Sequence, residues 1–177
     1  MLFMQDVAKE SAGTKFWRAV YLGIIGGIIS GFVKIGWEGL LPPRTTIRNL
    51  TNPPQELMQQ MGIPYRVTHA YFTYSGQHVQ FVSLILHFGF SIVFAILYCW
   101  LAEYWLKVTF LQGTVYGFVI WIAFHIIILP ALGTIPAPWL QPFDEHFSEF
   151  LGHLIWAWTF EICRHDFKAR MKHVVIE

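Results

Sequence analysis

The chain has 177 residues, of which 55% are hydrophobic and only 13% are charged, and its formal net charge is +1. Soluble domains carry about 25% charged residues, so this composition excludes an ordinary soluble domain. The near-neutral charge excludes the basic surface of a nucleic-acid-binding protein, and the length suits a single membrane domain over residues 1–177.

Four apolar segments follow one another along the chain, at residues 19–41, 79–104, 110–132 and 147–163. Each is close to the length of about 20 residues that an α-helix needs to cross a bilayer, and the fourth is the shortest and most polar. Two proline-rich connections, residues 42–78 and 133–146, separate them. The sequence therefore predicts an all-α polytopic membrane protein whose four transmembrane helices form a bundle, with a short extra helix at 54–61 in the first connection.

Lysine and arginine are distributed unevenly between the two ends of these segments. With four spans both termini lie on the same side, and eight lysines and arginines flank that side against three on the other. Because cytoplasmic loops carry the excess of positive residues, both termini are predicted to be cytoplasmic and both proline-rich connections to face outward. The eight are Lys9, Lys15, Arg18, Lys107, Arg164, Lys168, Arg170 and Lys172, and the three are Arg44, Arg48 and Arg66.

Each predicted span also contains ionisable residues, which are costly in hydrocarbon and usually face a bundle interior at a functional site. At about 1.5 Å per residue, His87 lies roughly 12 Å and His125 roughly 10 Å from the outer ends of their spans. The other ionisable residues fall at a similar depth. One polar site in the outer half of the bilayer is therefore predicted, formed by Lys34, Glu38, His87, His125, Glu149 and His153.

Small residues recur every four positions in two spans, as is typical of closely packed membrane helices. Lys34 and Glu38 continue the glycine face of the first span, and their i, i+4 spacing allows them to pair, either as a structural ion pair or as part of a functional site. Glu149 and His153 have the same spacing in the fourth span. The residues predicted to pack helices are Gly23, Gly27, Gly31, Gly113 and Gly117.

The first functional hypothesis is that this cluster handles or senses protons or cations, as a channel, a transporter or an acid-response protein. Histidine changes charge between about pH 5 and 8, and chains of acidic residues and histidines form proton relays within membranes. Lys34 would provide a counter-charge within this pathway. Because four helices enclose little space, a transport path also predicts a homo-oligomer in the lipid bilayer.

Two hypotheses from other classes remain open. His87, His125, His153 and Glu149 form a three-histidine, one-carboxylate set that suits Zn²⁺ or Fe²⁺, and two of the histidines could bind haem. The sequence lacks an H-E-x-x-H motif and Lys34 lies at the same depth, so the leading prediction includes no cofactor. The third hypothesis is a membrane scaffold subunit that assembles through its glycine faces.

Enzymatic motifs are missing from the sequence. It contains no Walker A motif, no Gly-rich dinucleotide fingerprint and no serine nucleophile elbow. A protein that is not an enzyme is therefore favoured, and catalytic residues stay unassigned.

Three stretches resemble a known family. They are Gly-Phe-Val-Lys34-Ile-Gly-Trp-Glu38 followed by Leu-Pro-Pro-Arg44, then Leu-His87-Phe-Gly-Phe-Ser-Ile-Val-Phe-Ala, then Ser148-Glu149-Phe-Leu-Gly-His153-Leu-Ile-Trp-Ala-Trp with Glu161-Ile-Cys-Arg164. Together they resemble the YagU-like family of bacterial inner-membrane proteins, over residues 20–170. The resemblance implies a multi-pass protein of the bacterial inner membrane. It also implies which positions carry the family's polar residues. These are Lys34, Glu38, Arg44, His87, His125, Glu149, His153 and Glu161.

Overall fold

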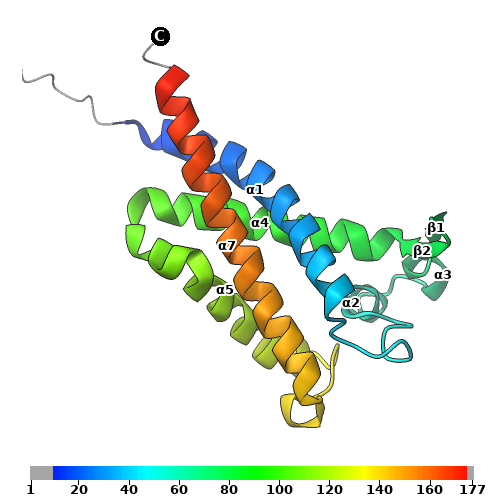
Figure 1. Cartoon of the computed structure of the whole chain (residues 1–177). Coiled ribbons are helices and arrows are strands. Elements are labelled where there is room, and N and C mark those ends of the chain that lie inside the picture. Colours follow the sequence, from blue (N-terminus) through cyan, green and yellow to red (C-terminus); the bar gives the residue numbers. More distant parts are fainter. Residues whose placement is uncertain (1–9, 175–177) are drawn as a thin grey trace, which may run out of the picture.

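The computed structural model describes residues 10–174, and helices dominate it (Figure 1). Lys9 and the side chain of Lys172, which contribute to the predicted charge asymmetry, lie outside the described part. The three longest helices are α1 (Ala12–Leu40), α4 (Phe81–Tyr104) and α7 (Phe143–Val174). The third predicted segment consists of several consecutive helical pieces.

Local sequence signals explain where α1 begins and ends. The Ser11 side chain accepts a hydrogen bond from the Thr14 backbone N–H at 3.0 Å, so it caps the first turn. The helix ends at Leu40 because Pro42 and Pro43 follow closely and disfavour further helix. α1 therefore starts earlier than the predicted residue 19 and ends close to the predicted residue 41.

The third predicted segment, residues 110–132, is broken near its start. Leu111, Gln112 and Gly113 have positive φ angles of 49°, 54° and 81°, so the chain turns sharply before regular helix begins. The pieces in chain order are the 3₁₀-helical η1 (Leu106–Gly113), α5 (Thr114–Trp121), the π-helical η2 (Ile122–Ile128) and α6 (Leu129–Ala131).

The π-helical stretch η2 contains His125 and lies just before Pro130. Proline has no backbone N–H, and its ring crowds the carbonyl group four residues earlier, here that of Ile126. A wider π turn at this point relieves that crowding, and π turns within α-helices are frequent at functional sites. The backbone irregularity thus coincides with one of the predicted site residues.

The first proline-rich connection, residues 42–78, has more regular structure than predicted. Its predicted short helix is confirmed as α2 (Pro53–Gln60), and Asn52 and Gln55 form a capping box at its start. A second short helix, α3 (Tyr65–Thr68), follows. In the other connection, η3 (Pro138–Leu140) precedes α7, which begins at Phe143 and not at residue 147.

A two-stranded sheet is the exception to the all-α prediction. β1 (Tyr71–Tyr74) pairs antiparallel with β2 (Gln77–Gln80). The two residues between the strands, Ser75 and Gly76, both have positive φ angles, as a tight hairpin turn with the right twist requires. The Ser-Gly pair is the sequence signal for this hairpin. The hairpin lies at the end of the predicted connection over residues 42–78.

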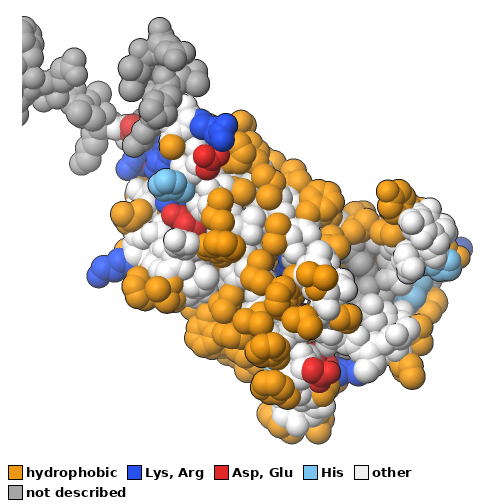
Figure 2. All heavy atoms as spheres, in the orientation of Figure 1, with side chains coloured by type: hydrophobic (Ala, Val, Ile, Leu, Met, Phe, Trp, Pro, Cys, Tyr) orange, Lys and Arg blue, Asp and Glu red, His pale blue; other side chains and the backbone are white. Residues whose placement is uncertain are grey.

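Three helical stretches of the described chain are long and apolar enough to cross a membrane: α1, α4 and the composite stretch Leu106–Ala131. α7 does not meet the same hydropathy criterion, because charged residues occur from its first turn, at Asp144 and Glu145, to its last turns. The structure is thus that of a predominantly helical membrane protein, and apolar side chains cover most of the visible face between its charged ends (Figure 2).

α1 packs along both α4 and α7, and α5 packs against α7 (Figure 1). α4 and α5 meet at the η1 turn and diverge toward their other ends, while α2, α3 and the hairpin lie near the far end of α4 (Figure 1). Aromatic side chains fill the core where the helices cross, and Tyr98, Trp156 and Phe160 are fully buried there. Side chains of α4 and of the composite stretch Leu106–Ala131, called the third helix below, line a cleft beside this core.

An ion network joins three helices on the opposite side of the core. The Glu103 carboxylate of α4 accepts hydrogen bonds from Arg18 of α1 at 2.5 Å and from Lys168 of α7 at 2.6 Å. Nearby, the Tyr98 hydroxyl donates to Glu161 of α7 at 2.8 Å. We call this set the inner network, and it fixes the three helices to one another at that end.

Candidate functional site

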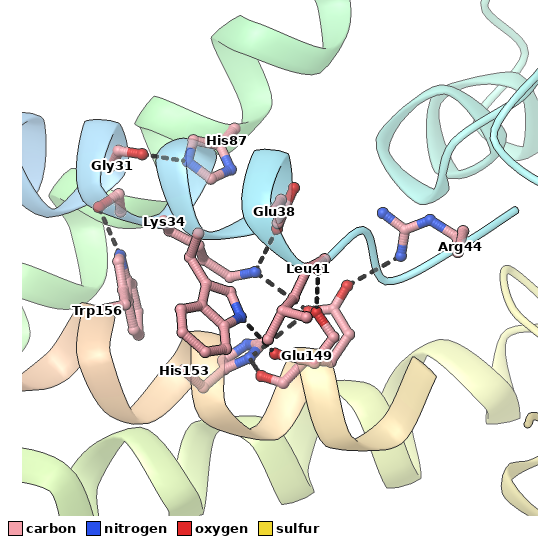
Figure 3. Close-up of polar contacts among 12 residues, drawn as sticks. Gly31, Lys34, Glu38, Leu41, Arg44, His87, Glu149, His153 and Trp156 are labelled. Carbon is pink, nitrogen blue, oxygen red and sulfur yellow. Dashed lines mark hydrogen bonds and ion pairs between the residues drawn. The ribbon is translucent and has the colours of Figure 1, made fainter. Parts of the chain in front are cut away.

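A buried carboxylate lies at the centre of the predicted polar site. Glu149 of α7 accepts hydrogen bonds from Lys34 Nζ at 3.1 Å and from Arg44 Nη1 at 2.9 Å, and its side chain is only 8% exposed. Lys34 also donates to Glu38 Oε1 at 2.5 Å, one turn further along α1. Figure 3 shows these side chains pointing toward one another from α1, the first connection and α7. We call this group the outer cluster.

Local contacts bring the first connection over the outer cluster. Pro42 and Pro43 end α1, and the chain then turns back so that Arg44 reaches Glu149. The Ser148 hydroxyl donates to the Leu41 carbonyl group, and Trp37 Nε1 donates to the Ser148 carbonyl group at 2.9 Å. The end of α1 is therefore attached to the first turns of α7 by side-chain hydrogen bonds to main-chain carbonyl groups as well as by ion pairs.

Two of the three predicted histidines have defined hydrogen bonds. His153 Nδ1 lies 2.7 Å from the Glu149 backbone carbonyl and 3.7 Å from Glu149 Oε2. His87 Nε2 lies 3.0 Å from the Gly31 carbonyl. Because a carbonyl oxygen only accepts, each of these ring nitrogens carries a hydrogen, which leaves Nε2 of His153 and Nδ1 of His87 as the basic nitrogens.

His125 is the third histidine, and it lies in a small group of unsatisfied side chains. Its Nε2 is buried and has no hydrogen-bond partner among the described residues, and the same holds for Trp121 Nε1 and His146 Nδ1. The rings of His125 and His146 are 5.4 Å apart, and Trp121 stacks on His125. His125 therefore faces the site without bonding directly to the outer cluster.

A cleft of about 730 Å³ connects all six predicted site residues. It lies between α4 and the third helix, with Lys34, Glu149 and His153 on the side formed by α1 and α7. This volume is in the range of small-molecule pockets. The structure thus brings the predicted residues into one space, although only some of them touch. Those that line it are Lys34, Glu38, His87, His125, Glu149 and His153, together with Arg44.

The charges within the outer cluster balance. Lys34 and Arg44 contribute two positive charges, and Glu38 and Glu149 contribute two negative charges. With neutral histidines the cluster has no net charge. A buried group of charges is tolerated when each is paired in this way.

The residues proposed to bind a metal do not converge on a point. Among residues 10–171, whose side chains the structure describes, no group of three or more histidine, cysteine, aspartate or glutamate side chains is arranged to hold a metal ion. Glu149 is instead engaged by two cations, and His87 Nε2 donates to the backbone of α1. The donor set therefore does not fit Zn²⁺ or Fe²⁺ in this arrangement, and haem binding stays an untested prediction.

The glycines predicted to pack helices do so within the chain. A Cβ atom at Gly27 would lie 2.5 Å from Ile92 Cα of α4, and one at Gly23 would overlap Ile96. In the third helix, a Cβ at Gly117 would overlap the His153 carbonyl of α7. Gly31 and Gly113 are similarly close to Phe88 and Tyr98. An oligomer would have to use other surfaces, so the predicted homo-oligomer stays a prediction.

Some residues of the site were not singled out by their sequence pattern. Arg44 came only from the family resemblance, and the Pro42-Pro43 pair before it was the signal that the chain reverses there. A second pair, Arg48 and Glu145, lies beside the outer cluster. Burial raises the pKa of the Glu145 carboxyl, which precedes the fourth predicted span, and the nearby arginines oppose this shift.

Comparison with known proteins places the chain in a family. The family described as "Protein of unknown function (DUF1440)" matches residues 28–162, which include every residue of the outer cluster. The inner membrane protein YagU of Escherichia coli (strain K12) is 32% identical over 181 residues, covering 90% of this chain and 88% of that protein. No solved structure matches the chain. The chain therefore belongs to the DUF1440 family and, like YagU, is a multi-pass protein of the bacterial inner membrane.

Proposed function

We propose that the chain senses or handles protons in the outer half of the inner membrane, through Glu149 and His153. The observation that carries this proposal is the buried Glu149 carboxylate, shared by Lys34 and Arg44, with His153 Nδ1 at 3.7 Å. Histidine changes charge between about pH 5 and 8. A histidine beside this carboxylate would link external pH to the contact between α1 and α7.

The balanced charge of the outer cluster favours protons over metal cations as the species handled. Lys34 and Arg44 already neutralise the two carboxylates, so an entering metal ion would meet no excess of negative charge. A proton needs only one basic nitrogen, and His153 Nε2 has no hydrogen-bond partner among the described residues.

Protonation of His153 would change the contacts of Glu149. The charged groups around Glu149 are Lys34 and Glu38 of α1 and Arg44 of the first connection. Across the cleft lie His87 of α4 and His125 of η2. A new positive charge next to Glu149 would compete with Lys34 and Arg44 for the same carboxylate. External acid is therefore expected to loosen the attachment of α1 and the first connection to α7.

The packing beneath the site favours sensing over conduction by a single chain. Trp156 and Phe160 are fully buried on α7, between Glu149 of the outer cluster and Glu161 of the inner network. A proton path through one chain would have to pass this aromatic core. A channel or transporter would therefore need either a second copy or a rearrangement of the core, whereas a sensor needs neither.

The proposal includes a topology of four spans within one membrane domain, with both termini cytoplasmic. α7 would provide the fourth span over residues 147–163, because its charged residues in that range turn toward the bundle. Glu149 binds Lys34 and Arg44, and Glu161 binds Arg164 and Tyr98. Charges satisfied in this way are the kind tolerated within membrane bundles.

Spin labels can test whether external acid loosens the outer cluster. Cysteines replacing Ile47 and Phe143, both largely exposed, would report the distance between the first connection and the start of α7, since Cys99 and Cys163 are buried. We expect a longer and broader distance distribution at pH 5 than at pH 8 in liposomes. The His87→Ala, His153→Ala double variant should lose this change.

A matched double variant serves as the control. His78→Ala with His165→Ala removes two exposed histidines outside the cleft, and the pH response should persist. Proton flux measured in the same liposomes separates transport from sensing. A distance that is independent of pH, together with a flux that the His87, His153 double variant leaves unchanged, would contradict the proposal.

A further inference from the structure

The cleft between α4 and the third helix has an apolar part that proton sensing does not use. Phe90, Val93 and Phe94 line it from α4, and Phe124 and Leu132 line it from the other side. Val93 is 60% exposed and Leu132 is 55% exposed, so the rim opens toward the surroundings of the bundle. In a membrane those surroundings are lipid chains.

The length of the cleft matches one leaflet of a bilayer. Its lining residues on α4 run from Ser83 to Phe94, which is about 16 Å along the helix. The hydrocarbon core of a bilayer is about 30 Å thick, so one leaflet contributes about 15 Å. The end of the cleft near Asn52 and Pro53 lies beside the first turn of α4, where Asn52 contacts Ser83, and this is the end expected to meet the lipid headgroups.

The polar end of the cleft has one donor and one acceptor to spare. Arg44 uses Nη1 on Glu149 and Nε on Asn49, and its Nη2 has no hydrogen-bond partner among the described residues. Glu38 uses Oε1 on Lys34, and its Oε2 is likewise without a partner in the described part of the chain. Both side chains line the cleft. A positive and a negative group with unused hydrogen-bonding capacity therefore lie at the same end of an apolar space.

We propose that this cleft binds a zwitterionic phospholipid of the phosphatidylethanolamine type. Its phosphate would accept a hydrogen bond from Arg44, its ammonium group would donate to Glu38, and an acyl chain would lie along Phe90, Val93 and Phe94. A zwitterionic headgroup complements this end, because the outer cluster has no net charge and an anionic headgroup would leave Oε2 of Glu38 without a hydrogen-bond donor. The inference shares the cleft with the proton proposal but does not depend on it.

Native mass spectrometry of the full chain in mild detergent tests this inference. The measurement uses equal amounts of dioleoyl phosphatidylethanolamine and dioleoyl phosphatidylglycerol at a pH of about 7.5, where an ordinary histidine is mostly neutral. Under these conditions we expect one phosphatidylethanolamine per chain. Its adduct should exceed that of phosphatidylglycerol by about tenfold, the effect of one charge-assisted hydrogen bond. Glycerophosphoethanolamine, which has no acyl chains, should not compete.

Two variants probe the two ends of the cleft. Gly89 lines the cleft with nothing within 4 Å of a Cβ atom, so Gly89→Leu would fill the apolar part without disturbing the helix packing. Glu38→Gln would remove the partner of the ammonium group. Each should lower phosphatidylethanolamine binding by about tenfold.

Matched controls come from the same protein. Gly36→Leu adds the same side chain at another open glycine that does not line the cleft, and Arg66→Gln removes an exposed arginine that does not line it either. Both should bind the lipid as the unmodified chain does. Equal binding of the two lipids, or undiminished binding by Gly89→Leu, would overturn the inference, and neither result bears on the pH response of His153.

Discussion

Glu149 has more charged partners than any other residue of the outer cluster. It is bound by Lys34 from α1 and by Arg44 from the first connection, and His153 lies one turn away on the same helix. Removing one member of a buried ion pair leaves its partner without compensation, which is much more costly than losing an exposed pair. The cluster is therefore expected to matter for stability as well as for function.

Replacing Lys34 tests whether the outer cluster stabilises the folded chain. Lys34→Met should lower the free energy of unfolding by about 3–5 kcal/mol, because Glu38 would lose its ion-pair partner and Glu149 would keep only Arg44. Unfolding by denaturing detergent in mixed micelles measures the difference. Arg170→Met, which removes a pair with Asp166 whose side chains are 73% and 52% exposed, should change it by less than about 1 kcal/mol.

A double variant separates charge from packing at this position. Lys34→Met combined with Glu149→Gln removes both charges of the pair and should recover part of the lost stability. Equal losses for Lys34→Met and Arg170→Met would show that Lys34 is not held in a buried pair.

At the scale of elements, the glycine face of α1 determines how closely α4 approaches. Gly23 and Gly27 meet the backbone of α4 at Ile96 and Ile92, so there is no space for even a methyl group. Contact of this kind places His87 near Gly31 and sets the position of the cleft wall relative to Lys34. The packing of two helices thus determines the geometry of the polar site.

Substitution of Gly27 is therefore expected to disturb α1 and α4 together. Gly27→Ala would place a methyl group 2.5 Å from Ile92 Cα, and overpacking of this kind costs about 1–3 kcal/mol. Gly36→Ala is the control, since nothing lies within 4 Å of its Cβ position. The same unfolding measurement compares them, and a Gly27→Ala variant as stable as Gly36→Ala would contradict the close helix contact.

Helical periodicity and span depth were enough to predict that the side chains of the polar site lie close together, and they line one cleft. Lys34, Glu149 and His153 lie at one depth on faces that turn inward, and such positions follow from 3.6 residues per turn. The partners of each side chain could not be predicted in the same way. The return of Arg44 depends on the turn after α1, and the position of His125 depends on a π turn, neither of which follows from hydrophobic periodicity.

The whole molecule has two polar ends separated by an apolar middle. The inner network and the outer cluster lie on opposite sides of the aromatic core, and the outer cluster lies on the side of the hairpin and the two connections. The excess of lysine and arginine on the side of the termini predicts an orientation of the chain in the membrane that can be measured.

Cysteine labelling in intact cells tests that orientation. Tyr74 in the hairpin and Lys107 in η1 are exposed, so Tyr74→Cys should react with a membrane-impermeant maleimide in intact cells. Lys107→Cys should react only after the membrane is permeabilised. Cys99 and Cys163 are buried and give little background. The reverse pattern would place the termini outside.

The inner network also determines how the bundle can move. Glu103 and Glu161 join α1, α4 and α7 at one end, and Glu149 lies about 18 Å from Glu161 along α7. If the outer cluster separates, the helices cannot slide past one another as rigid rods, because their inner ends stay joined. They would instead pivot about the inner network, and the displacement would be largest at the opposite end of the bundle, where the two connections lie.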